Sequence, residues 1–194
     1  MAIERTLVII KPDGIQRGLI GEILDRFEQT GLKFVGMKMV WPDKKLVGNH
    51  YTGDEKYNTE VGEKALKNAK EHGKEMNESA LDIGLRIRET NIRYLSTGPV
   101  LAFVLEGNTA IKSVRNIIGG TNPLTADIGT IRGDYTIDDF AQADIESRAV
   151  RNLMHASSEP DEAKREIALW FSDKELYDYQ TVMDKVLHDP SWGA

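Results

Sequence analysis

The sequence contains no cysteine and no long run of apolar residues. Without cysteine the chain can form neither a disulfide bond nor a thiolate metal site, and its nucleophile cannot be a thiol. No stretch approaches the ~20 apolar residues that a membrane-spanning helix needs. The apolar run at residues 6–10 is too short for a signal peptide. We therefore expect a cytoplasmic protein with no membrane partner.

An excess of positive charge is also missing. The formal net charge is −6 and the isoelectric point is about 5.3. Proteins that bind nucleic acid usually carry a basic surface, so this balance disfavours a nucleic-acid partner. An acidic protein that handles phosphates must instead concentrate its cations in one cleft. The 194 residues, of which 40% are hydrophobic, suit a single domain spanning residues 1–194.

Apolar runs alternate with segments of helical periodicity along the chain. Strands are expected at residues 6–10, 34–39, 99–105 and 152–155. Helices are expected at residues 19–27, 44–50, 61–74, 81–95, 111–118 and 160–170, with Asp43, Asn108 and Ser158 at three of their starts. The helices are too few for a doubly wound sheet. The pattern therefore predicts an α+β fold, in which helices cover one face of an antiparallel sheet.

Three segments depart from this alternation. Residues 52–91 are rich in Glu, Lys and Asn and form an insert with helical character. Residues 121–134 form a long loop dense in Gly, Pro, Thr and Asp, and such loops are often functional. Residues 138–148 are acidic, and we expect them to be peripheral.

The four histidines differ in their surroundings. His72 in the insert and His188 in the tail are expected to be solvated, and His50 is expected to cap or pack a helix end. His155 follows a short apolar strand and precedes a turn of small residues. There a neutral imidazole could be exposed and oriented by a neighbour, although these surroundings alone slightly favour a structural histidine.

Three cations are candidates for binding phosphate. Lys11 follows a buried strand and precedes the turn at residues 12–14, where it could point into a cleft or lie along the surface. Arg115 alone is typical of a solvated helix face. Arg132 lies among glycines in the long loop, and its guanidinium could bind an oxyanion through two hydrogen bonds. No GxxxxGK[ST], GxGxxG or HExxH motif is present.

Taken in order, several short motifs form a specific pattern. They are KPDGIQRGLIGEI at residues 11–23, HY at 50–51, STGPV at 96–100, TNP at 121–123, GTIRGD at 129–134, NLMHAS at 152–157 and REIALWF at 165–171. Together they resemble the nucleoside diphosphate kinase family. The resemblance covers nearly the whole chain except the insert at 52–91, an extended loop at 135–150 and the tail. It implies a ferredoxin-like antiparallel sheet covered by helices, with an inserted helical segment.

The resemblance also implies an activity. The γ-phosphate of a nucleoside triphosphate such as ATP would pass to a nucleoside diphosphate such as GDP. The reaction would be ping-pong, through a phosphohistidine at His155. Mg²⁺ would be held mainly by the nucleotide phosphates, with no dedicated protein ligand. A homo-oligomer, hexamer or tetramer, is the expected assembly.

Site residues follow from the matching positions. The catalytic residues that the resemblance implies are His155, Lys11, Glu166 and Tyr51. The residues implied to bind nucleotide and phosphate are Lys11, Arg115, Thr121, Arg132, Asn152 and Ile87. Glu166 would accept a hydrogen bond from the far ring nitrogen of the histidine and fix its tautomer. Imidazole suits the nucleophile because it is neutral near pH 7 and its phosphoramidate stays reactive.

The sequence departs from the family pattern in several places. Ser158 stands where the family usually has an aspartate, so a hydrogen bond at the helix start would be made differently. Ile87 occupies the position of a phenylalanine that stacks on the base, and Tyr57 is a candidate substitute. The insert at 52–91 is expected to form a lid or an oligomer contact.

Three other functions are compatible with parts of the sequence. A catalytically silent binding module would share the fold, but the candidate site residues are all present. A nucleic-acid-binding protein is disfavoured by the net charge. A kinase that passes the phosphate to a protein would use the same nucleophile.

Overall fold

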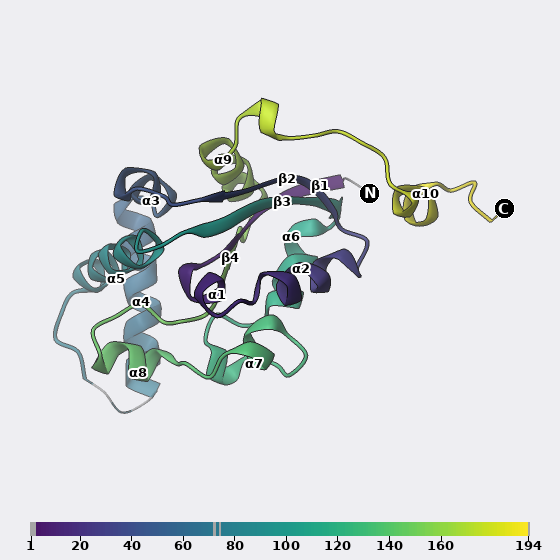
Figure 1. Ribbon diagram of the computed structural model, residues 1–194. Helices are drawn as coiled ribbons and strands as arrows, with labels where there is room; N and C mark the ends of the chain where they lie inside the picture. The colour runs from purple at the N-terminus through teal and green to yellow at the C-terminus, as the bar shows by residue number, and fades with distance from the viewer. Residues whose placement is uncertain (1–2, 72, 74, 194) are drawn as a thin grey trace.

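Figure 1 shows the computed structural model, which describes residues 3–71, 73 and 75–193. Four strands form one sheet in the order β2-β3-β1-β4, and all neighbouring pairs are antiparallel. The strands are β1 (Ile3–Ile10), β2 (Lys33–Val40), β3 (Val100–Asn108) and β4 (Met154–Ala156). The antiparallel sheet predicted from the sequence is therefore confirmed. In the register of the sheet, His155 on β4 pairs with Ile9 on β1.

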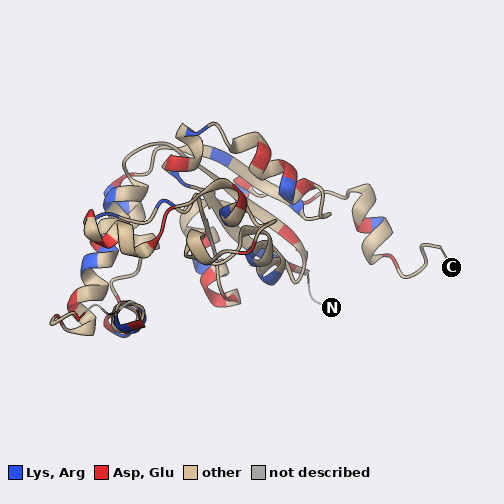
Figure 2. Cartoon of the chain, turned by 90° about the horizontal axis from the view of Figure 1, so that it is seen from below, with Lys and Arg blue, Asp and Glu red and all other residues tan. Residues whose placement is uncertain are grey.

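Helices connect and cover the strands. Those before β3 are α1 (Pro12–Gln16), α2 (Ile20–Glu28), α3 (Lys44–His50), α4 (Glu55–Glu71) and α5 (Ala80–Leu95). Those after it are α6 (Ala110–Ile118), η1 (Pro123–Thr125), α7 (Ile131–Tyr135), α8 (Phe140–Ile145), α9 (Pro160–Trp170), η2 (Asp173–Glu175) and α10 (Val182–His188). Lys and Arg are interspersed with Asp and Glu over the molecule as a whole (Figure 2).

The prediction that helices cover only one face of the sheet is wrong. One buried cluster joins Val8 and Phe103 to residues of α2 and α6. A second joins Leu7 and Val104 to residues of α3, α5 and α9. Successive side chains of a strand point to opposite faces. The uninterrupted apolar runs of β1 and β3 therefore place apolar side chains on both faces of the sheet, and helices must cover both faces to bury them.

Several local predictions need correction. Residues 12–16 form the short helix α1 instead of a simple turn, with Pro12 at a first-turn position that suits its fixed φ. The cap residue of α6 is Thr109, in a left-handed conformation at φ 50°, and not Asn108. Two short helices, η1 and α7, lie within the segment predicted to be a long loop. His72 lies outside the described residues.

The insert folds into a helical hairpin of α4 and α5. The two helices approach so closely that a Cβ atom on Gly62 would lie 1.7 Å from the carbonyl oxygen of Ala80. A Cβ atom on Gly84 would lie 1.8 Å from the carbonyl oxygen of Asn58. Asn58 is itself buried and donates hydrogen bonds to the Thr52 and Asp54 carbonyls. Glycine at both positions therefore lets the helix backbones touch.

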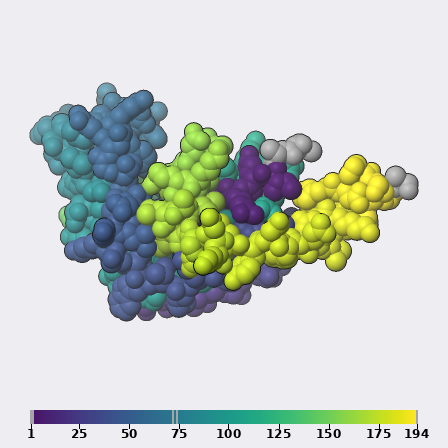
Figure 3. Space-filling view, turned by 90° about the horizontal axis from the view of Figure 1, so that it is seen from above, coloured from purple at the N-terminus to yellow at the C-terminus, as the bar shows by residue number. Residues whose placement is uncertain are grey.

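The C-terminal segment follows the free edge of β2. The backbone N–H of Tyr177 donates to the Val35 carbonyl at 2.7 Å, and the Tyr179 hydroxyl donates to the Phe34 carbonyl. Beyond this edge the segment with α10 extends outward (Figure 3). Met183 and Leu187 of α10 lie against Gly31, whereas Trp192 remains 54% exposed. Among the described residues, no helix is long and apolar enough to cross a membrane.

Candidate active site

A cavity of about 640 Å³ brings together nearly all the predicted site residues. Its walls come from α4 and α5 of the insert, from α6, α7 and α8, and from β4. The predicted residues that line it are Lys11, Tyr51, Ile87, Arg115, Thr121, Arg132, Asn152 and His155. Glu166 lies behind His155 and is 1% exposed. A volume of this size lies within the range of small-molecule sites.

His155 is held by a buried carboxylate. Its Nε2 lies 3.0 Å from Oε2 of Glu166, which also accepts a hydrogen bond of 2.6 Å from the Ser157 hydroxyl. Burial alone would raise the pKa of Glu166, but the charge and hydrogen bond of His155, with Ser157, lower it to about 2. An ionised carboxylate only accepts hydrogen bonds, so Nε2 carries the proton. The other ring nitrogen, Nδ1, keeps its lone pair.

His50 lies directly beside this pair, which the sequence did not predict. Its ring contacts the His155 ring edge-on with centroids 4.4 Å apart, and its Nδ1 lies 3.3 Å from Glu166 Oε1. The Trp170 indole N–H lies 3.2 Å from the same nitrogen. Burial, followed by the charge of His155, lowers the pKa of His50 to about 3, so it is neutral at pH 7. The HY motif at residues 50–51 was the sequence feature that could have placed His50 at the site.

Lys11 is the most perturbed cation of the cavity. The side chain is 7% exposed, and its ammonium donates a 2.7 Å hydrogen bond to Asn152 Oδ1. Burial, and secondly the charge of Arg132, lower the pKa of Lys11 to about 7. Of the two possibilities that the sequence left open, the lysine points into the cleft. The charge of Asp13 offsets only part of this lowering, so an anionic ligand in the cavity would favour the charged form of the lysine.

Arg132 plays a larger structural part than the sequence suggested. It lies on α7, and its guanidinium donates to the carbonyls of Asn152 and Met154 at 3.0 and 2.7 Å. It also donates to the carbonyls of Gly119 and Gly120. These four bonds use most of its five N–H groups. Burial and the charge of Arg115 lower the pKa of Arg132 to about 10. The side chain therefore fixes the chain on both sides of Leu153 while keeping its charge at the cavity.

The start of α9 shows how the Ser158 departure is accommodated. The backbone N–H and the hydroxyl of Ser158 both donate to Glu162 Oε2, each at 2.6 Å. The hydrogen bond expected at the helix start is thus made in another way, as predicted. Glu166 lies four residues after Glu162 on α9, about one helical turn further along.

Three possible metal ligands lie close together beside the cavity. Ligand atoms of His50, His155 and Glu166 lie within 4.8 Å of one another. They already contact one another, so an ion there would displace these contacts. Within the described part of the chain, the carboxylates that line the cavity are Asp144 and Glu162, among many Lys and Arg side chains. This set lacks a carboxylate cage and fits Mg²⁺ that enters already bound to nucleotide phosphates.

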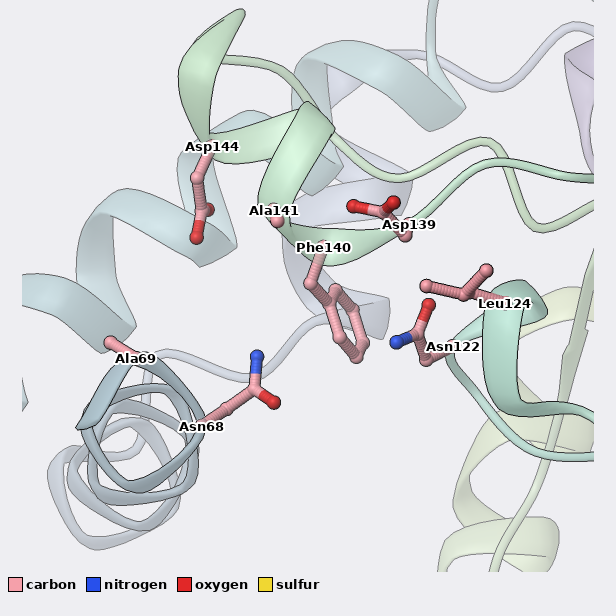
Figure 4. A pocket seen from close by; sticks show the side chains of 8 residues that line it. All are labelled: Asn68, Ala69, Asn122, Leu124, Asp139, Phe140, Ala141 and Asp144. Carbon is pink, nitrogen blue, oxygen red and sulfur yellow. The ribbon is translucent and has the colours of Figure 1, made fainter. Parts of the chain in front are cut away.

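One residue group that the sequence placed elsewhere lines the cavity. Residues 138–148 were expected to be peripheral, yet Phe140, Ala143 and Asp144 of α8 form part of the wall. Phe140 also borders a second, smaller pocket of about 70 Å³ (Figure 4). Asp144, Ser147 and Arg148 of the same segment also line the cavity, so its acidic, polar composition gave no sign of this role.

The fold and cavity define a ferredoxin-like α+β protein with a carboxylate-held histidine in a cavity lined by Lys and Arg side chains. The family model described as nucleoside diphosphate kinase matches residues 4–62 and 84–176. A nucleoside diphosphate kinase of Pyrobaculum aerophilum is 42% identical over 181 residues, covering 91% of this chain and 99% of that protein. The chain therefore belongs to the nucleoside diphosphate kinase family, which confirms the family predicted from the sequence.

Solved structures agree with this assignment. An NDP kinase from Pyrobaculum aerophilum has a TM-score of 0.87 at 40% identity, over 91% of this chain and 100% of that chain. A nucleoside-diphosphate kinase from Borrelia burgdorferi, solved as a transition state mimic with bound vanadate and ADP, has a TM-score of 0.77 at 33% identity. It covers 95% of this chain and 96% of that chain. The ferredoxin-like fold is confirmed.

Proposed function

We propose that this protein is a nucleoside diphosphate kinase that works through a phosphohistidine at His155. The observation that carries the proposal is the pairing of His155 Nε2 with Glu166 in a cavity that also holds Lys11, Arg115 and Arg132. The pairing leaves Nδ1 as the nucleophilic nitrogen. The cations supply the charge that phosphoryl oxygens need. The Borrelia burgdorferi relative, with vanadate and ADP bound, supports a site of this chemistry.

The reaction has two balanced halves. In the first, the Nδ1 lone pair of His155 attacks the γ-phosphorus of a nucleoside triphosphate. A P–N bond forms, the P–O bond to the β-phosphate breaks, and its electron pair leaves with the diphosphate. In the second, a terminal oxygen of another nucleoside diphosphate attacks the phosphorus of the phosphohistidine. A P–O bond forms, the P–N bond breaks, and its electron pair returns to Nδ1. Throughout, the Nε2 proton stays in its hydrogen bond to Glu166, which offsets positive charge on the ring.

The remaining residues position the nucleotide. Lys11, Arg115, Thr121 and Arg132 would contact phosphates, and Asn152 would hold the sugar while its Oδ1 accepts from Lys11. The hydroxyl of Tyr51 stays protonated, because burial and the charge of Glu166 raise its pKa. Mg²⁺ bound to the incoming phosphates would neutralise part of their charge. The resemblance further predicts a hexamer or tetramer in the cytoplasm, and light scattering after gel filtration tests the assembly.

The experiment is to mix the protein with Mg²⁺ and γ-labelled ATP and to measure acid-labile, base-stable label on the chain. We expect label on the wild type and on His188→Ala, a control at an exposed histidine, and none on His155→Ala. Added GDP should remove the label and yield GTP. A wild-type protein that takes up no label would contradict the proposal and favour the silent binding module.

A further inference from the structure

The C-terminal end of α3 carries two residues of the site. His50 is the last residue of the helix, and its ring contacts the His155 ring with centroids 4.4 Å apart. Tyr51 follows it and lines the cavity. The last four carbonyls of an α-helix have no partner within the helix, so other groups must satisfy them. The first of these in α3, the Val47 carbonyl, accepts a hydrogen bond of 2.9 Å from the Tyr51 N–H.

Arg88, on α5 of the insert, binds the carbonyls at this end of α3. Its Nε donates to the Tyr51 and Thr52 carbonyls at 2.7 and 3.1 Å. Its Nη2 donates to the Gly48 carbonyl at 2.8 Å. The side chain is half-buried, and its partners lie 36 to 40 residues earlier in the sequence. The insert is therefore bonded directly to the segment that carries Tyr51.

Arg165, on α9, binds the remaining carbonyls of the same segment. It donates to the Asn49 and His50 carbonyls at 3.1 and 3.3 Å. It directly precedes Glu166, the carboxylate that holds His155. Both α5 and α9 contact α3 (Figure 1). The five carbonyls of residues 48–52 are thus bound by two guanidinium groups from two different helices.

Arginine suits the position of Arg88 for two reasons. The C-terminal end of a helix carries partial negative charge, so a cation there is favourable. The planar guanidinium also presents its N–H donors in a fixed arrangement, which the compact ammonium of lysine lacks. Because Gly48 and Thr52 flank the His50–Tyr51 pair, bonds to both fix the backbone from which these two side chains project.

We propose that Arg88 is a positioning residue for His155, which acts through the end of α3. By fixing residues 48–52 it holds the His50 ring against the His155 ring and the Tyr51 side chain at the cavity. The insert is then part of the framework of the catalytic centre as well as a wall of the cavity. The inference rests on the proposed function for its effect on the rate, whereas the position of His50 can be measured without it.

The test measures first the rate of phosphoryl transfer. Arg88→Ala removes the bonds and Arg88→Lys keeps the charge. The control is Arg5→Lys, which changes a guanidinium on β1 that pairs with Glu106. With saturating ATP we expect His155 of Arg88→Ala to be phosphorylated on the order of ten-fold more slowly, because a small misplacement of reacting groups has an effect of this size or more. Arg88→Lys should lose part of the rate, and Arg5→Lys should keep it.

Two features distinguish positioning from a loss of stability. The KM for ATP should change little in Arg88→Ala, because the guanidinium is occupied by carbonyls and not by the nucleotide. Methylguanidinium at millimolar concentration should restore the rate of Arg88→Ala, because it can replace the lost group at the half-buried site. It should not change the rate of Arg5→Lys.

The second measurement does not depend on phosphoryl transfer. The indole N–H of Trp170 is buried and lies 3.2 Å from His50 Nδ1, so its NMR resonance reports the position of His50. This resonance should shift in Arg88→Ala and return toward its wild-type position with methylguanidinium. It should stay in place in Arg5→Lys.

Several outcomes would overturn the inference. One is an unchanged rate and an unchanged Trp170 resonance in Arg88→Ala, whether or not its Tm falls. Another is a loss that methylguanidinium does not restore. If Arg88→Ala does not fold, a wild-type rate and resonance in Arg88→Lys would overturn the inference instead. A wild type that forms no phosphohistidine would contradict the kinase proposal, while a shifted Trp170 resonance in Arg88→Ala would still support the placement of His50 by Arg88.

Discussion

Replacing Glu166 by glutamine tests how the carboxylate activates His155. The pKa of Glu166 lies at about 2 instead of its ordinary 4.5. This difference corresponds to about 3 kcal/mol of stabilisation of the ionised carboxylate by its surroundings. The side chain is 1% exposed, so solvent screens little of it. Glutamine keeps the shape and an oxygen acceptor for Nε2 but removes the charge. We expect His155 to be phosphorylated roughly 30- to 100-fold more slowly.

Rapid-quench measurement of the first turnover with ATP separates this step from nucleotide release. The control is Glu162→Gln, one turn earlier on α9, whose carboxylate accepts from Ser158 and not from His155. Its His155 should be phosphorylated at close to the wild-type rate.

The same carboxylate also contributes to the free energy of unfolding. Since the pKa of Glu166 is lowered on folding, this contribution is complete above pH 4.5 and is lost as pH falls toward 2. Glu166→Gln should lack that acid-dependent loss. Phosphorylation of Glu166→Gln within three-fold of wild type would refute the reasoning.

Two further predictions follow from burial and close packing. Gly84→Ala drives a Cβ atom to 1.8 Å from the Asn58 carbonyl oxygen, so thermal unfolding should show a loss of about 3 kcal/mol. Gly21→Ala, on α2 with nothing within 4 Å, should instead stabilise by roughly 0.5–1 kcal/mol, and similar losses in both variants would contradict this. Because the pKa of Lys11 is about 7, kcat/KM for nucleotide should fall as pH rises through 7. The fall should disappear in Lys11→Arg, whereas persistence there would assign it to another group. The unfolding free energy should rise over the same pH range, because the unfolded chain binds the proton more tightly.

Features set by neighbouring residues were predicted well from the sequence. Asp43 accepts a 2.7 Å hydrogen bond from the Leu46 N–H and caps α3, as its position before an apolar-periodic segment indicated. The β-branched run at residues 6–10 and the run at 99–105 lie in β1 and β3. In these cases the hydrogen bonds or the burial pattern are encoded within a few residues.

Features set by distant packing were predicted less well. The segment at 138–148 looks peripheral by charge, yet Phe140 lies beside Asn68 of α4 and Asn122, which are distant in the sequence. Arg132 looks like a free phosphate clamp, yet its bonds reach the Asn152 and Met154 carbonyls, 20 and 22 residues away. On the helix predicted at residues 81–95, the apolar Leu85 is 42% exposed, while the neighbouring Gly84 faces α4. None of these partners can be identified from local periodicity.

The backbone before His155 shows why a motif can be recognised without its physical role being clear. Leu153 has a φ of 65°, a left-handed conformation that costs a side-chain-bearing residue about 1–2 kcal/mol. Nothing in NLMH signals it, because such positions usually hold Gly or Asn. The cost is offset from both sides: Asp13 accepts the Leu153 N–H at 3.1 Å, and the Lys11 N–H donates to the Leu153 carbonyl at 2.8 Å. The KPDG motif therefore stabilises the bend at Leu153, which places Asn152 beside Lys11 and His155 at the cavity. Asp13 thus positions the nucleophile through a hydrogen bond to the backbone.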